Sequence, residues 1–201
     1  MDEKRGFMKH ILFYVGLFFI ALSFFSSVYA SNVLIIADSI GCGNQGDKPF
    51  PVVLQEICPQ HKIINDSIGG SITASGYDRL EKGLKNNHID VVIVTLGIND
   101  IGHKRPLQEI YNNFTKMASL CEKKHVRLIL GTIDALSYIH MTNDKNYCKT
   151  FNNIYYHVQN IYKVETFRFL YKEIIPYTID GFHLNQCGQN IIANKISKKI
   201  Q

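Results

Sequence analysis

The stretch that decides the fold is Asn32-Val33-Leu34-Ile35-Ile36-Ala37-Asp38-Ser39, in which an apolar run stops abruptly at two polar residues. A short, continuous run of aliphatic and β-branched residues that ends in turn-forming residues is typical of a strand buried on both faces of a sheet. The sequence therefore predicts a first strand at residues 32–36. Runs of the same kind predict four more strands, at residues 62–65, 91–96, 127–133 and 164–170.

Amphipathic helical patterns separate these strands. The clearest spans residues 107–124, where apolar side chains recur at a spacing of 3.6 residues: Leu107, Ile110, Tyr111, Phe114, Met117, Ala118 and Cys121. Further helices are expected at residues 76–86, 148–163 and 187–200, with a shorter one after Phe50. This alternation predicts a single α/β domain with three layers (α/β/α) around a parallel sheet. In such a sheet the C-terminal ends of all strands meet at one edge, where ligands bind.

The composition is that of a globular protein. Of the 201 residues 46% are hydrophobic and 19% are charged, and the formal net charge is +5. An apolar fraction of this size argues against a disordered chain. Because the basic residues are dispersed, we expect no nucleic-acid partner. A single long uncharged run excludes a protein that crosses a membrane several times.

The N-terminal segment has the features of an export signal. Basic residues at positions 4, 5, 9 and 10 precede the apolar run 11–25, and Val28-Tyr29-Ala30 has the spacing that a signal peptidase accepts. The apolar run is shorter than the roughly 20 residues that a membrane-spanning helix needs. We predict a signal peptide at residues 1–30, cleaved after Ala30, and a mature domain at 31–201 in the periplasm or outside the cell. The alternative is an uncleaved segment that anchors the chain to a membrane.

The cysteines show no pattern of metal ligation. They form no C-x-x-C pair and no zinc-type spacing with histidines. We therefore expect neither a metal nor another cofactor. In an oxidising compartment an odd number of cysteines leaves at least one thiol unpaired, and the sequence leaves open which others pair. The five are Cys42, Cys58, Cys121, Cys148 and Cys187.

One motif suggests a different function. Residues 41–46, Gly-Cys-Gly-Asn-Gln-Gly, fit the G-x-G-x-x-G fingerprint of dinucleotide-binding proteins, and Asp66 follows twenty residues beyond Gly46. In that fingerprint the glycines directly follow the strand and open a helix. Here Asp38-Ser39-Ile40 intervenes, and two prolines follow soon afterwards. We therefore interpret the glycines as a turn in which they permit positive φ angles.

Polar motifs follow four of the predicted strands. They are Ala37-Asp38-Ser39-Ile40, Ser67-Ile68-Gly69-Gly70, Gly97-Ile98-Asn99-Asp100 and, after the last strand and a loop, Asp180-Gly181-Phe182-His183-Leu184-Asn185. In type and order these motifs resemble the SGNH (GDSL-type) hydrolases, in particular the bacterial periplasmic thioesterases, lysophospholipases and arylesterases, and the resemblance covers essentially the whole mature chain. It implies an SGNH hydrolase fold with about five parallel strands in the flavodoxin-like order 2-1-3-4-5. Ala37, Ile40 and Leu184 depart from the pattern, in which Gly, Leu and Pro are usual.

The resemblance assigns a catalytic triad and an oxyanion hole. Ser39 is the expected nucleophile, a neutral hydroxyl that needs an adjacent base. His183 is expected to be that base, and Asp180 to accept the Nδ1 proton of His183. The N–H groups of Ser39 and Gly70 and the side-chain amide of Asn99 are the expected donors to the negative oxygen that forms when an acyl carbonyl is attacked.

Other residues receive supporting roles. Asp38 and Asp100 are expected to hold loops through bonds from side chain to backbone. Cys42 is not expected to act as a nucleophile, since no Cys–His signature surrounds it. Segment 134–147 is expected to be a loop that lines the acyl or leaving-group site, with an apolar wall of Ala135, Leu136, Tyr138, Ile139 and Met141. Six histidines are expected to be exposed: His61, His88, His103, His125, His140 and His157.

Together these features predict an exported serine esterase or thioesterase that hydrolyses small to medium acyl esters, thioesters or lysophospholipids through an acyl-enzyme on Ser39. We expect a monomer whose partners are its small-molecule substrates and, transiently, membrane lipid. Two alternatives stay open: a glycan O-acetyl esterase that acts on cell-wall or capsule sugars, and an exported binding domain without catalysis. The presence of Ser39, Asp180 and His183 together argues against the second.

Overall fold

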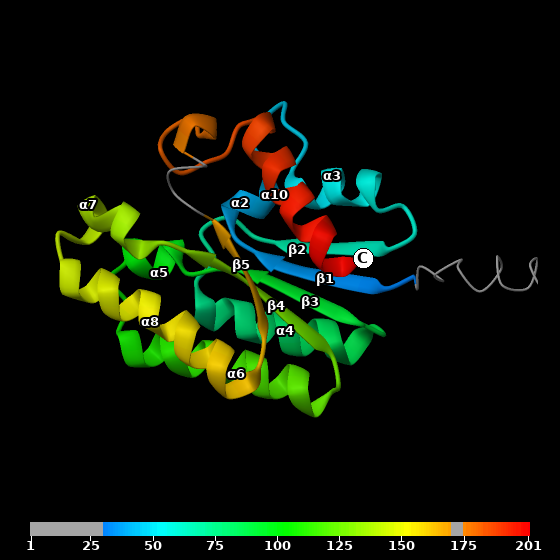
Figure 1. Cartoon of the computed structure of the whole chain (residues 1–201), viewed down its shortest axis with the longest axis horizontal. Coiled ribbons are helices and arrows are strands. Elements are labelled where there is room, and N and C mark those ends of the chain that lie inside the picture. The colour runs from blue at the N-terminus through cyan, green and yellow to red at the C-terminus, as the bar shows by residue number, and fades with distance from the viewer. Residues whose placement is uncertain (1–29, 170–174) are drawn as a thin grey trace, which may run out of the picture.

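The computed structural model describes residues 30–169 and 175–201. Their centre is a sheet of five parallel strands in the order β2-β1-β3-β4-β5, as Figure 1 shows. The predicted fold class and strand order are therefore confirmed. The strands are β1 (Asn32–Ala37), β2 (Lys62–Ser67), β3 (Val91–Thr95), β4 (Arg127–Ile133) and β5 (Glu165–Phe169).

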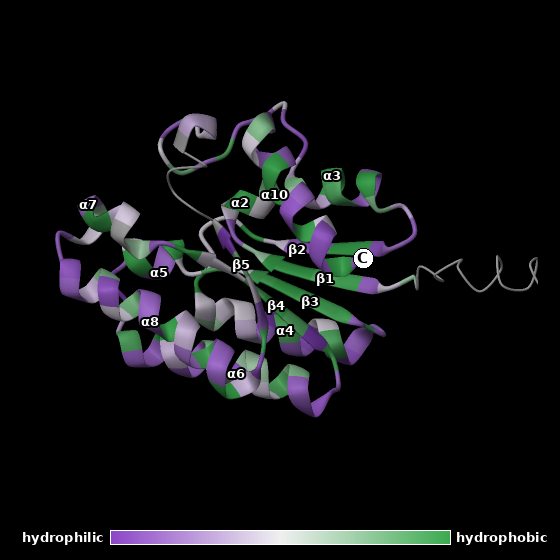
Figure 2. Ribbon diagram, in the orientation of Figure 1, coloured by the Kyte–Doolittle hydropathy of each residue, from purple (hydrophilic) through white to green (hydrophobic). Residues whose placement is uncertain are grey.

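Helices cover both faces of this sheet (Figure 1). One face carries α3 (Phe50–Ile57) and α10 (Gln186–Ile200), and the other carries α4 (Thr73–Asn86), α6 (Leu107–Lys123) and α8 (Lys145–Tyr162). The central strands are green in Figure 2, whereas purple residues mark the outer faces of the helices. The continuous apolar runs of the sequence are thus the strands that helices cover on both sides.

The strand register aligns the C-terminal ends of β1, β2 and β3 with one another in the sheet. Ala37, the last residue of β1, pairs with Ser67 of β2 on one side and with Thr95 of β3 on the other. The N–H of Ile68 also donates to the carbonyl oxygen of Ala37 at 3.1 Å. The loops that follow β1, β2 and β3 therefore leave the sheet side by side.

Segment 134–147 is more ordered than the predicted loop. It contains a 3₁₀ helix, η1 (Ala135–Tyr138), the short helix α7 (Ile139–Thr142) and the beginning of α8. Helix α8 begins earlier than predicted because Asp144 caps it: one carboxylate oxygen accepts the N–H groups of Asn146 and Tyr147, each at 2.9 Å. The prediction that this segment is a loop was wrong, and the overlooked sequence signal was Asp144, a residue type that caps the N-terminus of helices.

His61 is also not where the sequence placed it. It was expected to be exposed, but only 3% of its surface is accessible. Its Nδ1 accepts the N–H of Ser31 at 3.1 Å, just before β1 begins. This bond provides a partner for one nitrogen of the buried imidazole.

The glycine-rich segment 41–46 serves packing and turns. A Cβ at Gly41 would lie 2.2 Å from the Oγ of Ser67, and Gly43 has a φ of +74°. Asp66, the acid that a dinucleotide fingerprint would use, instead forms an ion pair at 3.5 Å with Arg79. These contacts account for the glycines without a bound nucleotide.

The predicted signal peptide falls almost entirely on residues 1–29, which lie outside the described residues, and it stays a prediction. Within the ranges 30–169 and 175–201, no helix has the length and apolar character needed to cross a membrane. All five cysteines lie in these ranges as free thiols; Cys58, Cys121 and Cys148 are buried, whereas Cys42 and Cys187 are exposed.

Candidate active site

Ser39, His183 and Asp180 meet at the C-terminal edge of the sheet. The Nε2 of His183 lies 3.1 Å from the Oγ of Ser39, and the Nδ1 of His183 lies 2.6 Å from Oδ2 of Asp180. An ionised carboxylate only accepts hydrogen bonds, so Nδ1 of a neutral imidazole carries the proton. Nε2 is then left to accept the hydroxyl proton of Ser39. The three side chains are arranged as a nucleophile, a base and an acid.

The loop that carries the acid and the base is held by its own backbone. Oδ1 of Asp180 accepts the N–H groups of Phe182 and His183 at 3.0 and 2.8 Å. Gly181, which lies between Asp180 and Phe182, has a φ of +86°, an angle that residues with a side chain rarely adopt. The bonds from His183, first that of its imidazole and then that of its backbone, lower the pKa of Asp180 to about 2. Asp180 is therefore ionised across the neutral and mildly acidic range.

We expect Asp180→Asn to lower kcat by up to about 10⁴-fold, because an amide favours the wrong tautomer of His183. Stability should respond to pH as well. A folded-state pKa below the ordinary value of 3.8 means that the ionised carboxyl stabilises the fold above about pH 4. This stabilisation is lost as the pH falls toward 2, and the variant should lack that part of the pH dependence.

Hydrolysis of p-nitrophenyl acetate and thermal unfolding at pH 7 and pH 3 measure both effects. Asp78→Asn, at an exposed aspartate of α4, is the matched control and should change neither. Full activity of Asp180→Asn would show that Asp180 does not orient the base.

Ser39 lies in a tight turn after β1. Ser39 begins the four-residue helix α2 (Ser39–Cys42), which Asp38 caps by accepting the N–H of Ile40 at 3.0 Å. The buried amide of Gln189 in α10 donates to the carbonyl oxygen of Ile40 at 3.1 Å. It also accepts the N–H of Phe50 at 2.8 Å. The side chain of Gln189 thus ties α10, which follows the loop of His183, to the turn that holds Ser39.

Asp38 is a buried acid directly before Ser39. Only 1% of its surface is accessible, and Oδ2 has no hydrogen-bond partner among the described residues. Burial raises its pKa to about 6, although the bond from the N–H of Ile40 opposes the shift. The expectation that Asp38 holds a loop by bonding the backbone is confirmed.

Asp38→Asn is expected to stabilise the protein at pH 7. The folded-state pKa lies above the ordinary 3.8, so the folded state retains a proton that the unfolded state releases. The carboxyl therefore costs more stability as the pH rises from about 4 to about 6, and the full cost persists above 6. Because the new amide N–H group also lacks a partner, we expect a gain of about 1–2 kcal/mol, less than the full shift implies.

Urea denaturation at pH 4 and pH 7 tests this expectation, since the gain should shrink toward pH 4. Asp78→Asn again provides the control for removal of an exposed carboxylate. A variant that is less stable than the wild type at pH 7 would contradict the assignment of Asp38 as a destabilising buried acid.

Gly70 and Asn99 come from the loops after β2 and β3. The N–H of Ser71 donates to the carbonyl oxygen of Ile68 at 3.2 Å, which closes a turn whose third residue, Gly70, has a φ of +73°. This type of turn requires a positive φ at that position, which favours glycine. A Cβ at Gly70 would meet nothing within 4 Å, so glycine is needed for its backbone angle, not for space. The side-chain amide of Asn99 donates to the carbonyl oxygen of Ser71 at 3.0 Å, and its second N–H is available for an oxyanion.

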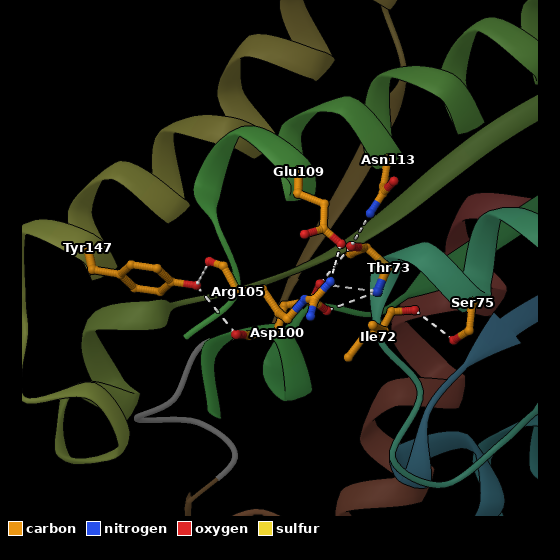
Figure 3. A network of polar contacts seen from close by, with 8 residues as sticks. All are labelled: Ile72, Thr73, Ser75, Asp100, Arg105, Glu109, Asn113 and Tyr147. Atoms are coloured by element: carbon orange, nitrogen blue, oxygen red, sulfur yellow. Dashed lines mark hydrogen bonds and ion pairs between the residues drawn. The ribbon is translucent and has the colours of Figure 1, made fainter. Parts of the chain in front are cut away.

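A buried polar network lies behind these loops (Figure 3). Asp100 accepts the hydroxyl of Thr73 at 2.7 Å and the N–H of Thr73 at 3.0 Å. Asn113 of α6 donates to the same hydroxyl at 3.0 Å. Tyr147, at the start of α8, donates to the carbonyl oxygen of Arg105 at 2.8 Å. Burial raises the pKa of Asp100. The expectation that Asp100 bonds the backbone is confirmed, and the network joins α4, α6 and α8 around it.

Three aromatic rings meet beside the histidine loop. The ring of Phe182 stacks on Tyr138 of η1 with centroids 5.7 Å apart, and it lies 5.5 Å from the ring of His140 in α7. The residue before His183 therefore contacts the segment that follows β4. This contact brings part of segment 134–147 close to the triad.

The predicted apolar wall is only partly on the surface. Ile139 is 38% exposed and Met141 is half-buried, with its methyl group 2.8 Å from where a Cβ at Gly102 would lie. Ala135 is fully buried, so it supports the segment from within the core and offers no surface to a substrate. Tyr138 is buried against Phe182. The side chain of Leu136 lies outside the described part of the structure.

Sequence reasoning missed Thr73, Asn113, Phe182 and Gln189. Phe182 could have been noticed, since it lies inside the motif that carries the acid and the base. Thr73, Asn113 and Gln189 show no local signal, because their partners are between 27 and 149 residues away. In the described ranges, no group of three or more His, Cys, Asp or Glu side chains is arranged to hold a metal ion.

A nucleophile, a base and an acid at the edge of a parallel α/β/α sheet, with N–H donors on the neighbouring loops, form the arrangement of a serine hydrolase. The GDSL-like Lipase/Acylhydrolase family matches residues 36–191, and the chain belongs to that family. It is thus a GDSL-type esterase or acylhydrolase, which confirms the resemblance seen in the sequence.

Known proteins agree with this assignment. An arylesterase of Vibrio mimicus is 26% identical over 185 residues, which cover 87% of this chain and 90% of the relative. The crystal structure of the psychrotrophic esterase EstA from Pseudoalteromonas sp., inhibited by monoethylphosphonate, matches with a TM-score of 0.73 at 19% identity and covers 85% of this chain and 96% of EstA. The acetyl xylan esterase AlAXEase matches with a TM-score of 0.70 at 21% identity, over 85% of this chain and 100% of that one.

Proposed function

We propose that this protein is an exported serine esterase that cleaves small to medium acyl esters and thioesters, including lysophospholipids, through an acyl-enzyme on Ser39. The observation that carries the proposal is the separation of 3.1 Å between the Oγ of Ser39 and the Nε2 of His183. This is a hydrogen-bond distance between a hydroxyl and the base that would activate it. The roles of Asp180, Gly70 and Asn99 belong to the same proposal.

The reaction follows from these positions. His183 takes the hydroxyl proton while the Oγ of Ser39 bonds to the carbonyl carbon, and the carbonyl oxygen becomes an anion. The N–H groups of Ser39 and Gly70 and the amide of Asn99 donate to that anion. As the tetrahedral intermediate collapses, the bond to the alcohol or thiol breaks and His183 returns its proton to the leaving group. A water molecule, deprotonated by His183, then releases the acid and restores Ser39.

A series of p-nitrophenyl esters from acetyl to dodecanoyl tests the substrate class. The proposal expects turnover that extends beyond acetyl, together with hydrolysis of an acyl thioester and of a lysophospholipid. Folded protein that hydrolyses none of the esters would contradict the esterase assignment. A fluorophosphonate probe should label Ser39 and no other residue, as mass spectrometry of the digest would show.

A glycan O-acetyl esterase is the second candidate. It is favoured by the rings of Phe182 and His140 beside the triad, which offer flat surfaces for a sugar ring. The fold likeness to an acetyl xylan esterase is compatible with it. A strict preference for acetyl over every longer chain, with faster hydrolysis of acetylated xylan than of p-nitrophenyl acetate at equal ester concentration, would support this candidate over the first.

Export is supported by the basic start and the apolar run within residues 1–30. The test is to express the full chain, separate the cell fractions and determine the N-terminal sequence of the protein. A mature chain that starts at Ser31 in the periplasm or medium is expected. A full-length chain in the membrane fraction would favour the anchored alternative.

A further inference from the structure

We propose that Thr73 is a positioning residue for the esterase reaction: by bonding Asp100, it holds the loop of Gly70 against the loop of Asn99 and so sets the geometry of the oxyanion hole. The inference deepens the proposed function and rests on it, because it concerns the same site. Thr73 does not contact the substrate in this proposal. It acts through the two donors that its neighbours present.

The argument begins with the places of the two residues in the chain. Thr73 follows Gly70 by three residues and begins α4, and Asp100 directly follows Asn99. The carboxylate of Asp100 accepts both the hydroxyl of Thr73, at 2.7 Å, and its N–H, at 3.0 Å. Gly70 and Asn99, two of the three oxyanion donors, are therefore each within three residues of a shared anchor.

A second bond joins the same two loops closer to the reaction centre. The side-chain amide of Asn99 donates to the carbonyl oxygen of Ser71 at 3.0 Å. Two bonds at different distances from the oxyanion donors fix the relative orientation of the two loops as well as their separation. A single bond would fix only the separation. Donors in an oxyanion hole must lie at hydrogen-bond distance from a specific point, so small displacements are costly to the rate.

Burial explains why the Thr73–Asp100 pair is rigid. The accessible surface is 0% for Thr73 and 1% for Asp100, so water does not compete for these bonds. The bond from the Thr73 hydroxyl to the carboxyl group of Asp100 is short, at 2.7 Å, and a buried carboxyl group that loses a donor pays the penalty of an unsatisfied polar group. The same burial keeps a substrate from touching either side chain.

The hydroxyl of Thr73 acts both as a hydrogen-bond donor and as an acceptor. It donates to Asp100 and accepts from the side-chain amide of Asn113 in α6, at 3.0 Å (Figure 3). Serine can make both bonds, whereas valine has the shape of threonine and can make neither. This difference separates the effect of the hydroxyl from the effect of side-chain volume.

The experiment compares Thr73→Val and Thr73→Ser in the wild-type chain and in an Asn99→Ala chain, with p-nitrophenyl acetate as substrate. We expect Thr73→Val to lower kcat by about 10–100-fold, less than the loss of a whole donor, with KM within about threefold of wild type. Thr73→Ser should keep kcat within about threefold. In the Asn99→Ala chain, Thr73→Val should lower kcat by a smaller factor than in the wild-type chain, because one of the two donors that it positions is already absent.

Three outcomes would overturn the inference. They are an unchanged kcat in Thr73→Val, an equal loss with and without Asn99, and a Thr73→Ser protein that is folded yet as slow as Thr73→Val. Thermal unfolding monitors the fold of every variant, and if valine is not accommodated, Thr73→Ala removes the same hydroxyl without added bulk. Failure of the proposed function would look different, since wild-type protein would then hydrolyse no ester at all.

Discussion

Ser39→Ala should lower kcat/KM for p-nitrophenyl esters by at least about 10⁴-fold and leave the fold intact. The alanine removes the hydroxyl that the proposed mechanism uses as its nucleophile, and His183 then has no hydroxyl to activate. The structure also predicts that little stability is lost. The only side-chain hydrogen bond described for Ser39 is the one to His183, a half-exposed residue, so we expect a change of about 1 kcal/mol or less.

The measurement combines steady-state kinetics, thermal unfolding and labelling by a fluorophosphonate. Ser75→Ala is the matched control, because its hydroxyl donates to the carbonyl oxygen of Ile72 at 3.0 Å and is not part of the triad. That control should keep its activity and its labelling. If Ser39→Ala retained turnover or if the probe still reacted, for example at the exposed thiol of Cys42, Ser39 would not be the nucleophile.

Gly97→Ala should cause the largest loss of stability, about 3 kcal/mol or more. Gly97 has a φ of +120° and a ψ of −20°, a conformation that is strained for any residue with a side chain. An added Cβ would lie 2.8 Å from Cζ of Phe151 and 2.9 Å from the hydroxyl oxygen of Tyr155. Those two rings pack edge to face, and the Tyr155 hydroxyl donates to the carbonyl oxygen of Leu96 at 2.9 Å. Neither ring can move aside without breaking contacts in the core.

Urea denaturation measures this loss, and Gly46→Ala separates its two causes. Gly46 also has a positive φ, +90°, but a Cβ there would meet nothing within 4 Å. Its alanine variant should therefore show only the backbone strain, about 1–2 kcal/mol. Gly97→Ala should also lose activity, because Gly97 directly precedes α5 (Ile98–Gly102), which carries Asn99. Similar stability losses at both glycines would mean that the aromatic side chains adapt to the added methyl group.

Much of the site was predictable because its signals are local. Asp180 and His183 are three residues apart, so one short loop carries both, and the resemblance to the SGNH hydrolases assigned them as acid and base. Ser39, Gly70 and Asn99 each follow a strand, and parallel strands end at one edge of a sheet. The apolar runs thus indicated the edge of the sheet, and the resemblance to the SGNH hydrolases indicated which residues of that edge form the site.

The amino-acid order by itself therefore determined the alternation of strands and helices and the edge of the sheet at which the polar motifs gather, since hydrophobic periodicity and strand ends are properties of neighbouring residues. The order of the strands across the sheet came from the resemblance to the SGNH hydrolases. The tertiary structure alone decided which remote side chains touch. No local pattern encodes the hydrogen bonds of Asn113 to Thr73 and of Gln189 to Ile40. The same holds for the stacking of Phe182 on Tyr138 and for the bond that the buried His61 accepts from Ser31. The pKa of Asp38 is raised by burial, which also comes from the tertiary structure. These features depend on how helices and loops pack across the sheet, and packing is set by the shapes and distances of residues far apart in the chain.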